Sequence, residues 1–372
     1  MRALRALRLL AGQAARAHIA KHGLQPQDVA GVAAAAGGPK GLAFLHLDTW
    51  LFGEWLAQSE RPRLLAGASI GAWRMAAAVH PDGPAATRRL GEAYLECQRY
   101  RLQPSPHEVS QACAQVVNAT LGPVPAFIDG ASRGHTLAVI TARARGALAH
   151  QARKRDFIRP ALANLVARHR LGAHLQRVVF EHPGSTSAPH GHSGAGLQAL
   201  IEPADPFHTV QVPLHARNVA QALLASGSIP LVAQAVVNPA DAPSGQYWDG
   251  GLIDYHLLLN WSRLDGLVLY PHFAPYLTAG WLDKSLPWRR AAQRGASAAL
   301  SRMVLAVPSP ELLAKLPGGK LPDRRDFHVY GLDHDRRIRR WRQAMAECEA
   351  MVDDLDGFIR RPDPSRLEPL EA

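Results

Sequence analysis

Apolar residues follow two different spacings over the first eighty positions of the chain. An uninterrupted apolar run at Val29–Ala36 stops at a glycine pair, which is typical of a buried strand. Apolar side chains then recur three and four residues apart, as on one side of a helix, at Phe44, Leu47, Leu51 and Trp55. The pattern repeats as a short apolar segment at Arg63–Ala66 and a helical stretch at Ile70–Val79. Strands that alternate with helices predict a mainly parallel sheet with helices on its faces.

The rest of the chain carries weaker versions of the same signals. We expect helices over Arg88–Arg99, Asp156–Arg168, Ala216–Ser226 and Asp335–Ile359. We expect strands over Leu137–Thr141, Arg177–Phe180, Val232–Val237, Gly266–Tyr270 and Phe327–Tyr330. Ahead of the first strand, apolar spacing predicts a helix with one apolar side, formed by Leu4, Leu7, Leu10 and Ala14. Basic residues interrupt this segment too often for a signal peptide, although its composition also fits a transit peptide.

The first chemical signal is Gly67-Ala68-Ser69-Ile70-Gly71, which lies between a predicted strand and a predicted helix. A serine at such a turn has a strained backbone, and the flanking glycines let the chain bend that tightly. Its hydroxyl projects at the helix N-terminus, where free N–H groups favour a developing negative charge. These features predict a nucleophilic Ser69, and the alternative is a tight turn with a serine cap.

A second glycine-rich turn, Gly37-Gly38-Pro39-Lys40-Gly41, also joins a predicted strand to a predicted helix. Paired glycines can direct backbone N–H groups toward an oxyanion. Pro39 has no N–H, so Gly38 is the best donor, followed by Gly37 or Lys40. A nucleotide-binding phosphate loop needs Gly-Lys followed by Ser or Thr, and neither this turn nor Gly319-Lys320 fulfils that pattern. An oxyanion hole is therefore the better interpretation.

A third signal, Asp249-Gly250-Gly251, follows the aromatic pair Tyr247-Trp248. An Asp followed by two glycines is usually a turn. A serine hydroxyl is a poor nucleophile until a base takes its proton, and an aspartate can act as that base when partial burial raises its pKa. The two aromatic residues would supply an apolar setting, which makes Asp249 a candidate general base.

In order and separation these motifs resemble those of the patatin-like phospholipase family, over about Val29 to His256. Four blocks are similar to family patterns, namely Gly37–Gly41 to GGx[RK]G, Gly67–Gly71 to GxSxG, Ala225–Pro230 to ASxxxP and Asp249–Gly251 to DG[GA]. Pro39 departs from the first pattern, and the chain beyond about Arg263 does not match the family. We therefore divide the chain into an N-terminal basic helix (1–28), a patatin-like catalytic domain (29–262) and a C-terminal extension (263–372) that packs on the core.

The resemblance implies a three-layer α/β/α sandwich around a mainly parallel sheet. It implies hydrolysis of fatty acyl esters in phospholipids or related lipids, of the phospholipase A or lysophospholipase kind, with no metal and no cofactor. Ser69 would be the nucleophile that forms an acyl-enzyme, and Asp249 its general base. Oxyanion-hole donors would come from Gly37, Gly38, Lys40 and Ile70. The glycines expected to support the motifs are Gly41, Gly67, Gly71, Gly250 and Gly251.

Two other interpretations stay open. Three histidines would give the Ser, Asp, His chain order of an α/β-hydrolase carboxylesterase with a triad, namely His272, His328 and His334. Such an enzyme can also have an oxyanion loop upstream of its nucleophile, so only Asp-Gly-Gly favours the dyad. Outside the enzymes, the alternative is a catalytically silent lipid-binding scaffold on the same fold, although every expected catalytic residue is present.

Charge suggests where the protein acts. The formal net charge is +11 and the pI about 10.0, which favours association with anionic surfaces. The first 27 residues carry five basic and no acidic side chains, and Trp281 and Trp288 lie among basic residues. We therefore predict peripheral, reversible contact with anionic membranes, with core packing of the two tryptophans as the alternative. No motif supports nucleic-acid binding.

The cysteines and one histidine cluster bear on compartment and metal binding. The three cysteines form no CxxC pair, which fits a reducing compartment and leads us to expect a cytoplasmic protein. His182, His190 and His192 lie in a segment rich in Pro, Gly and Ser. Without a nearby carboxylate or cysteine they make a poor metal site, and we interpret the segment as a mobile flap over the active site.

Overall fold

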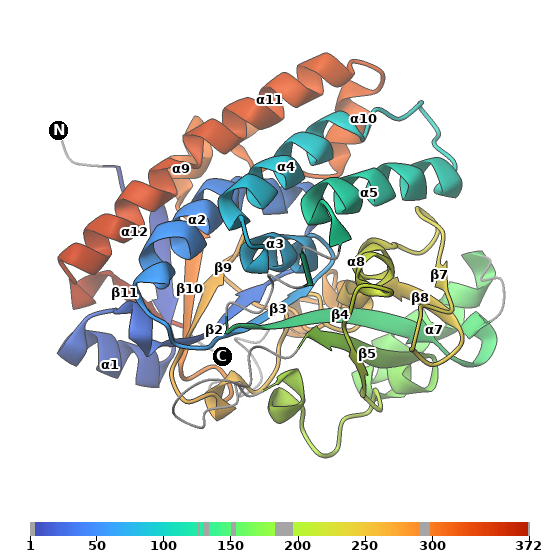
Figure 1. The fold of residues 1–372 in the computed structure, drawn as a ribbon, viewed down its shortest axis with the longest axis horizontal. Helices are drawn as coiled ribbons and strands as arrows, with labels where there is room; N and C mark the ends of the chain where they lie inside the picture. Colours follow the sequence, from blue (N-terminus) through green and yellow to red (C-terminus); the bar gives the residue numbers. More distant parts are fainter. Residues whose placement is uncertain are drawn as a thin grey trace.

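The computed structural model describes residues 4–124, 127–128, 134–149, 154–182, 196–289 and 298–370 (Figure 1). The described strands are β1 (Leu7–Ala11), β2 (Val29–Ala34), β3 (Leu64–Ala68), β4 (Thr136–Ala144), β5 (Leu175–His182), β6 (Val210–Pro213), β7 (Val236–Val237), β8 (Gln246–Asp249), β9 (Leu267–Pro271), β10 (Met303–Pro308) and β11 (Leu367–Pro369). The described α-helices are α1 (Gln13–His22), α2 (Leu45–Trp50), α3 (Ile70–Val79), α4 (Gly83–Glu96), α5 (Pro106–Leu121), α7 (Ile158–Val166), α8 (Val219–Gly227), α9 (Pro310–Lys315), α10 (Arg325–Tyr330), α11 (His334–Glu347) and α12 (Ala350–Arg360).

One sheet runs through the molecule in the order β11-β1-β10-β9-β2-β3-β4-β5-β6, and β8 pairs with both β4 and β7. The central pairs β10/β9, β9/β2, β2/β3 and β3/β4 are all parallel. Antiparallel pairing joins β1 to β10 and β5 to β4. The prediction of a mainly parallel sheet is confirmed.

Both faces of this sheet are covered. Helices α2 to α4 and α9 to α12 lie on one face (Figure 1). Short helical turns at Leu197–Leu200 and Trp261–Arg263 contribute to the core on the other face. Along β2, Val32 joins the first core and Ala33 the second. Because β2 is buried on both faces, its sequence is a continuous apolar run and not an alternation. These layers agree with the α/β/α sandwich expected from the resemblance.

The N-terminal prediction is wrong in its first half. Residues Leu7–Ala11 form a strand, and α1 begins only at Gln13. Because β1 lies between β10 and β11 and its leucines are buried, sheet pairing on both sides outweighs the helical spacing. A Cβ on Gly12 would overlap the carbonyl oxygens of Leu300 and Ser301, so glycine lets the chain pass this point closely on its way into α1.

Two C-terminal predictions also need correction. The expected strand at Phe327–Tyr330 is part of helix α10, in which Phe327 packs edge-on against Trp341 with ring centroids 5.5 Å apart. Four residues are too few to distinguish a strand from a helical turn by periodicity. The expected helix Asp335–Ile359 is two helices, α11 and α12. The segment 263–372 does more than pack on the core, because it supplies β9, β10 and β11 to the sheet. The three-part division of the chain stays a prediction.

Candidate active site

Two strands end against each other along one edge of β4. β3 runs parallel to β4, and its last residue, Ala68, lies opposite Ile140. β8 runs antiparallel to β4 along the same edge, and its last residue, Asp249, lies opposite Thr141. Ser69 follows Ala68 directly, so the facing strand ends bring Ser69 and Asp249 together across about 180 residues of sequence.

The backbone of Ser69 is strained and is held by α8. Its φ of 57° and ψ of −131° lie in a region that residues with a side chain rarely adopt. The Ser69 N–H donates to the Ser226 hydroxyl oxygen at 2.9 Å, and that hydroxyl donates to the Ile140 carbonyl at 2.7 Å. The Ser69 N–H therefore already has a hydrogen-bond acceptor. The next residue, Ile70, begins α3, and N–H groups in the first turn of a helix have no acceptor within the helix.

Gly71 lets the turn lie directly on β2. A Cβ at this position would overlap the carbonyl oxygen of Ala34. We expect Gly71→Ala to lower the free energy of unfolding by more than about 3 kcal/mol, because backbone must move to admit the methyl group. Gly357→Ala is the matched control, since Gly357 lies within α12 with nothing within 4 Å of its missing Cβ.

The control substitution should stabilise the protein by about 0.5–1 kcal/mol, the ordinary gain of alanine over glycine inside a helix. Urea unfolding of both variants and the wild type measures the two effects. Equal stability of Gly71→Ala and the wild type would contradict the close packing of the turn on β2.

Asp249 is anchored on its backbone and on its side chain. Its N–H donates to the Ser228 carbonyl at 2.8 Å, and its Oδ1 accepts the Gly251 N–H at 2.7 Å. The Ser69 side chain lies close enough to this carboxylate to lower its pKa. Burial raises the pKa of Asp249, and this effect outweighs the opposing influence of the Arg324 charge, the Ser69 side chain and the Gly251 N–H. A carboxylate that has a raised pKa and lies beside a hydroxyl has the properties required of a general base.

The Gly37–Gly41 turn lies beside the start of α3. Gly38 has a φ of +57°, and a Cβ there would come within 3.1 Å of the Arg324 Nε. Gly41 lies against Ile70, whose Cγ1 would be 2.6 Å from a Cβ at Gly41. Pro39 is in the first turn of a 3₁₀ helix that begins at Gly38, where a missing N–H removes no helical hydrogen bond. The departure from the family pattern is therefore compatible with the local backbone.

The other motif glycines are close to backbone as well. A Cβ on Gly67 would overlap the Gly71 carbonyl carbon, and one on Gly250 would overlap the Ile140 carbonyl oxygen. At Gly251 the Cβ would lie 2.8 Å from that of Ala36. The predicted supporting glycines thus all lie where a side chain would displace a neighbour.

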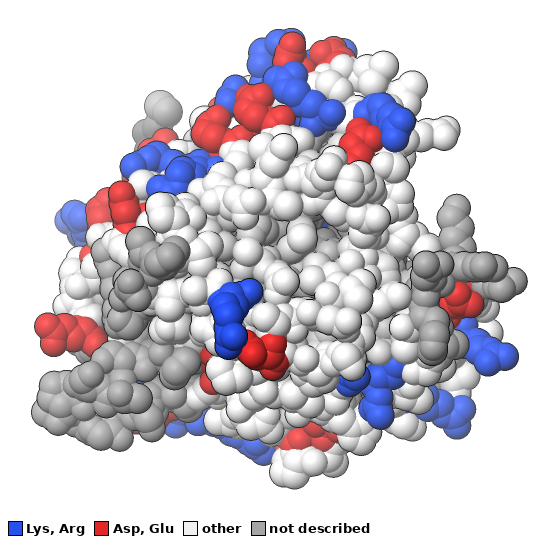
Figure 2. Space-filling model, turned by 45° about the vertical axis from the view of Figure 1, so that its right-hand side comes forward, with Lys and Arg blue, Asp and Glu red and all other residues white. Residues whose placement is uncertain are grey.

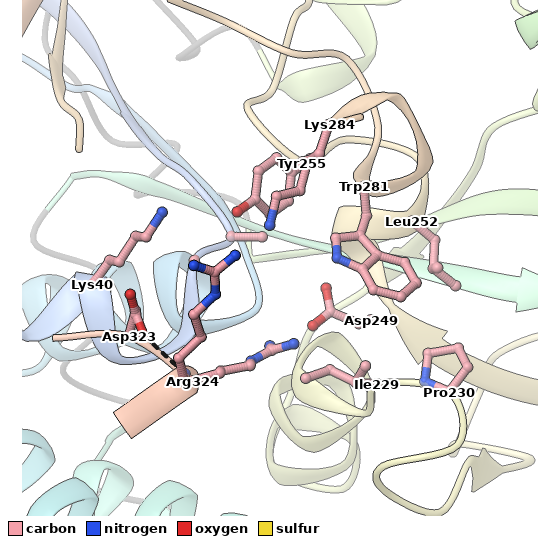
Figure 3. A pocket seen from close by; sticks show the side chains of 13 residues that line it. Lys40, Ile229, Pro230, Asp249, Leu252, Tyr255, Trp281, Lys284, Asp323 and Arg324 are labelled. Atoms are coloured by element: carbon pink, nitrogen blue, oxygen red, sulfur yellow. Dashed lines mark hydrogen bonds between the residues drawn. The ribbon is translucent and has the colours of Figure 1, made fainter. Parts of the chain in front are cut away.

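Two cavities meet at the Ser69–Asp249 pair. A mainly apolar cavity of about 340 Å³ is lined by Ser69 and Gly38 and by aromatic side chains that include Trp73, Tyr94 and Phe327. A second cavity of about 260 Å³ is lined by Asp249 and Gly37 together with four cationic side chains, namely Lys40, Lys284, Arg324 and Arg325 (Figure 3). Ile229 and Arg324 line both cavities. Ser69 thus lines a mainly apolar cavity, whose other two arginines, Arg101 and Arg337, have partners in Glu108 and the Gln98 carbonyl, and Asp249 lines a cavity with four basic side chains.

Several residues of the site were not predicted. Ser226 lies in the Ala225–Pro230 block, but the sequence gives no reason to connect its hydroxyl to Ser69. Lys284 and Arg324 come from the C-terminal segment, and among 42 basic residues nothing marks them. Trp281, which was discussed as an interfacial residue, lines the cationic cavity and is 39% exposed.

The histidines of the triad interpretation lie elsewhere. His272 is fully buried, and burial lowers its pKa to about 3, so that it stays neutral. His328 lines the apolar cavity, and His334 begins α11. Within the described ranges, no hydrogen bond joins any of the three to Ser69 or Asp249. His190 and His192, with the proposed flap, lie outside the described residues, and the described part of the chain holds no group of three or more candidate metal ligands.

Arg324 makes the pH dependence of this pair testable. Asp249 acts as a base only when ionised, so activity should fall as the pH falls through its pKa. Because the Arg324 charge opposes the rise in that pKa, Arg324→Gln should move the acidic limb of the kcat profile to higher pH. Hydrolysis of a short neutral ester measures the profile, and Arg339→Gln, at an exposed position of α11, is the control. An unmoved limb would contradict the electrostatic link.

A comparison with family models agrees with this geometry. The model described as patatin-like phospholipase matches residues 33–258, more than half of the chain. The chain belongs to the patatin-like phospholipase family. This match extends from β2 to just beyond β8 and so contains both strand ends that carry Ser69 and Asp249.

The patatin-like family is a family of lipid acyl hydrolases, whose reaction cleaves carboxylic esters. No curated protein matches the chain. No α-helix in the described residues is both long and apolar enough to cross a bilayer.

Proposed function

We propose that this patatin-like protein hydrolyses fatty acyl esters through an acyl-Ser69 intermediate, with Asp249 as the general base. The observation that supports this proposal best is the placement of Ser69, in its strained turn, beside the buried Asp249 at the facing ends of β3 and β8. Serine alone is a weak nucleophile, and a base in direct contact removes the need for a histidine between the two groups.

In the acylation step, Ser69 Oγ attacks the ester carbonyl carbon while its proton passes to Asp249. The tetrahedral oxyanion accepts hydrogen bonds from backbone N–H groups of Gly38 and Ile70, with Gly37 or Lys40 as a further donor. When the intermediate collapses, the bond to the alcohol oxygen breaks, and Asp249 returns the proton to that oxygen. The products are the free alcohol and an acyl group esterified to Ser69.

Water completes the cycle. Asp249 takes a proton from the water molecule as its oxygen attacks the acyl-Ser69 carbonyl. The second tetrahedral intermediate then releases the fatty acid, and the proton returns from Asp249 to Ser69 Oγ. Each half-reaction therefore uses the same base and the same oxyanion donors.

The shape of the site supports a long acyl chain. The apolar cavity begins at Ser69 and is lined by aromatic and aliphatic side chains of α3, α4, α5 and α10. Burial of the acyl chain there contributes about 0.8 kcal/mol for each methylene removed from water. We propose phospholipase A or lysophospholipase activity on this basis.

A fluorophosphonate probe followed by a panel of acyl esters tests the proposal. We expect covalent labelling at Ser69, located by peptide mass spectrometry, and faster turnover of long-chain than of acetyl esters. A folded protein that is neither labelled nor active on any ester would support the catalytically silent scaffold instead.

The surface around the apolar cavity supports contact with lipid aggregates. Five exposed aliphatic side chains lie at the mouth of this cavity or on the adjoining α10 segment, and we call them the apolar rim: Leu102, Leu231, Val232, Val329 and Leu332. Figure 2 shows a broad uncharged area on the side facing the viewer, interrupted near its middle by basic and acidic side chains that lie next to each other. We propose that the protein docks reversibly on anionic bilayers with this rim.

Vesicle co-sedimentation tests the docking proposal. We expect recovery on anionic vesicles to exceed that on neutral vesicles by at least about fivefold at low salt and to fall at high salt, because nearby basic residues add about 1 kcal/mol each. Val329→Asp/Leu332→Asp should reduce recovery, whereas Val237→Asp, at a residue that is also exposed but outside the rim, should not. If the rim variant and the control variant were recovered equally on anionic vesicles, docking by the rim would be contradicted.

A further inference from the structure

The cationic cavity lies on the Asp249 side of the reacting pair, while the apolar cavity lies on the Ser69 side. An acyl group attached to Ser69 extends into the apolar cavity. The alcohol oxygen must receive its proton from Asp249, so the alcohol portion of the substrate lies on the other side. The residues of the cationic cavity therefore face the leaving group.

Among the described residues, the four basic side chains of this cavity have no salt-bridge partner. In the described structure, none of the four side chains of Lys40, Lys284, Arg324 and Arg325 forms an ion pair or a hydrogen bond. Asp323 also lines the cavity, but its carboxylate pairs with Lys320 at 3.0 Å and accepts the Arg325 backbone N–H at 2.8 Å. Four basic side chains thus line the cavity beside two acidic ones, Asp249 and Asp323, which offset their charge only in part.

Aromatic rings hold two of these cations without neutralising them. The Lys40 ammonium lies 4.5 Å from the centre of the Phe273 ring, and the Lys284 ammonium lies 5.1 Å from that of Tyr255. Partial burial lowers the pKa of both lysines. The charge of Lys284 lowers the pKa of Lys40 further, the charges of Arg324 and Arg325 lower that of Lys284, and Asp323 opposes the change in both. These like charges repel one another across the cavity, and a bound anion would relieve that repulsion.

We propose that Lys40, Lys284, Arg324 and Arg325 form an anion subsite for the alcohol portion of the substrate. The preferred substrates are then acyl esters whose leaving alcohol carries a phosphate or carboxylate close to the ester. Figure 3 shows Lys40, Lys284 and Arg324 reaching the cavity from different segments of the chain. This inference rests on the proposed hydrolase function. Lys284, Arg324 and Arg325 lie outside residues 33–258, so the subsite is built largely by the segment beyond the family match.

Two esters that differ only in a phosphate group on the alcohol test the subsite. We compare 1-oleoylglycerol 3-phosphate with 1-oleoylglycerol, each at low mole fraction in micelles of a neutral detergent. We expect the wild-type kcat/KM to be at least about tenfold higher for the phosphate ester. Lys284→Gln should lower that ratio about fivefold or more, mainly through KM, and Lys284→Arg should retain it. Lys284 is chosen because Arg324 also acts on the pKa of Asp249.

The matched control is Lys315→Gln, which removes one exposed charge on α9 and should leave the ratio unchanged. A wild-type ratio near one, or the same ratio in Lys284→Gln as in the wild type, overturns the proposal. Inhibition of ester hydrolysis by inorganic phosphate is a second experiment. If it inhibits competitively while the wild-type ratio is near one, the cavity takes free phosphate and the assignment to the substrate is overturned.

Failure of the hydrolase function is recognised separately. In that case neither ester is cleaved and Ser69 is not labelled by the fluorophosphonate. Calorimetric binding of glycerol 3-phosphate to the wild type and to Lys284→Gln then decides the subsite. Binding weakened at least about fivefold by Lys284→Gln and unchanged by Lys315→Gln supports it, whereas equal binding, or none, overturns it.

Discussion

Replacing Ser69 with alanine will abolish hydrolysis of every acyl ester that the wild type cleaves, with a loss of at least about 10³-fold in kcat. The proposed route passes through a covalent bond to Ser69 Oγ, and alanine has no atom with which to form it. Fluorophosphonate labelling should disappear together with activity. Labelling that persists at another serine of a folded Ser69→Ala protein would contradict the assignment.

A second variant separates chemistry from backbone strain. Ser69→Gly also removes the hydroxyl, but glycine adopts positive φ without the steric cost that Ser69 bears at 57°. Ser69→Gly should therefore be equally inactive and about 1–2 kcal/mol more stable than Ser69→Ala. Thermal or urea unfolding of the two variants measures the difference. Equal stability would show that the turn imposes no strain on this residue.

Asp249→Asn should reduce kcat by about 10²- to 10⁴-fold, the usual effect of losing a general base. Asparagine keeps the shape of the side chain, and its amide oxygen can still accept the Gly251 N–H. It cannot take the proton from Ser69. Activity of the folded variant on a short-chain ester, measured beside the wild type across pH, gives the size of the loss.

Single replacement of His272, His328 or His334 by asparagine should leave kcat within about threefold of the wild type if these residues are not the base. A loss in any one folded variant that matches Asp249→Asn would favour the triad. His328→Asn is the most stringent of the three tests, because His328 lines the same cavity as Ser69. The fully buried His272 is the variant in which folding must be checked most carefully.

Asp249 should also limit stability at neutral pH. Burial raises its pKa in the folded protein, so the folded state binds this proton more tightly than the unfolded chain does. The resulting stabilisation is present below the unfolded pKa and is lost as the pH rises through the folded pKa. Asp249→Asn, which is never ionised, should therefore melt at a higher temperature than the wild type at pH 7. The difference should shrink in acid.

The sequence predicted the parts of the fold in which local pattern and tertiary environment agree. Residues Ile70–Val79 were predicted as a helix and form one with the same bounds, because an apolar helical stretch follows a glycine turn and ends before Pro81. Leu7–Ala11 was misassigned because its strand depends on partners near the other end of the chain. Pairing with strands that are distant in the sequence leaves no periodic pattern of apolar residues in the local sequence.

In the candidate site, too, the residues with a local sequence motif were predicted and those without one were not. Three short motifs pointed to Ser69, Asp249 and the glycine turn, because nucleophile turns and oxyanion loops need glycine at fixed offsets. The structure adds the reason that they meet, namely the facing ends of β3 and β8 along β4. Arg324 could not have been predicted, since an arginine without a motif has no local feature that connects it to a carboxylate 75 residues earlier.

The order of strands has a consequence for synthesis of the protein. β1 emerges from the ribosome first, yet both of its neighbours, β10 and β11, lie beyond residue 300. The edge of β2 that pairs with β9 likewise stays unpaired until β9 has been made. Unpaired strand edges are sites of aggregation, so we expect the nascent chain to depend on chaperones until β10, which ends at Pro308, and then β11, which ends at Pro369, have been made. A chain truncated after β8 would retain Ser69 and Asp249 and still leave β1 without either neighbour.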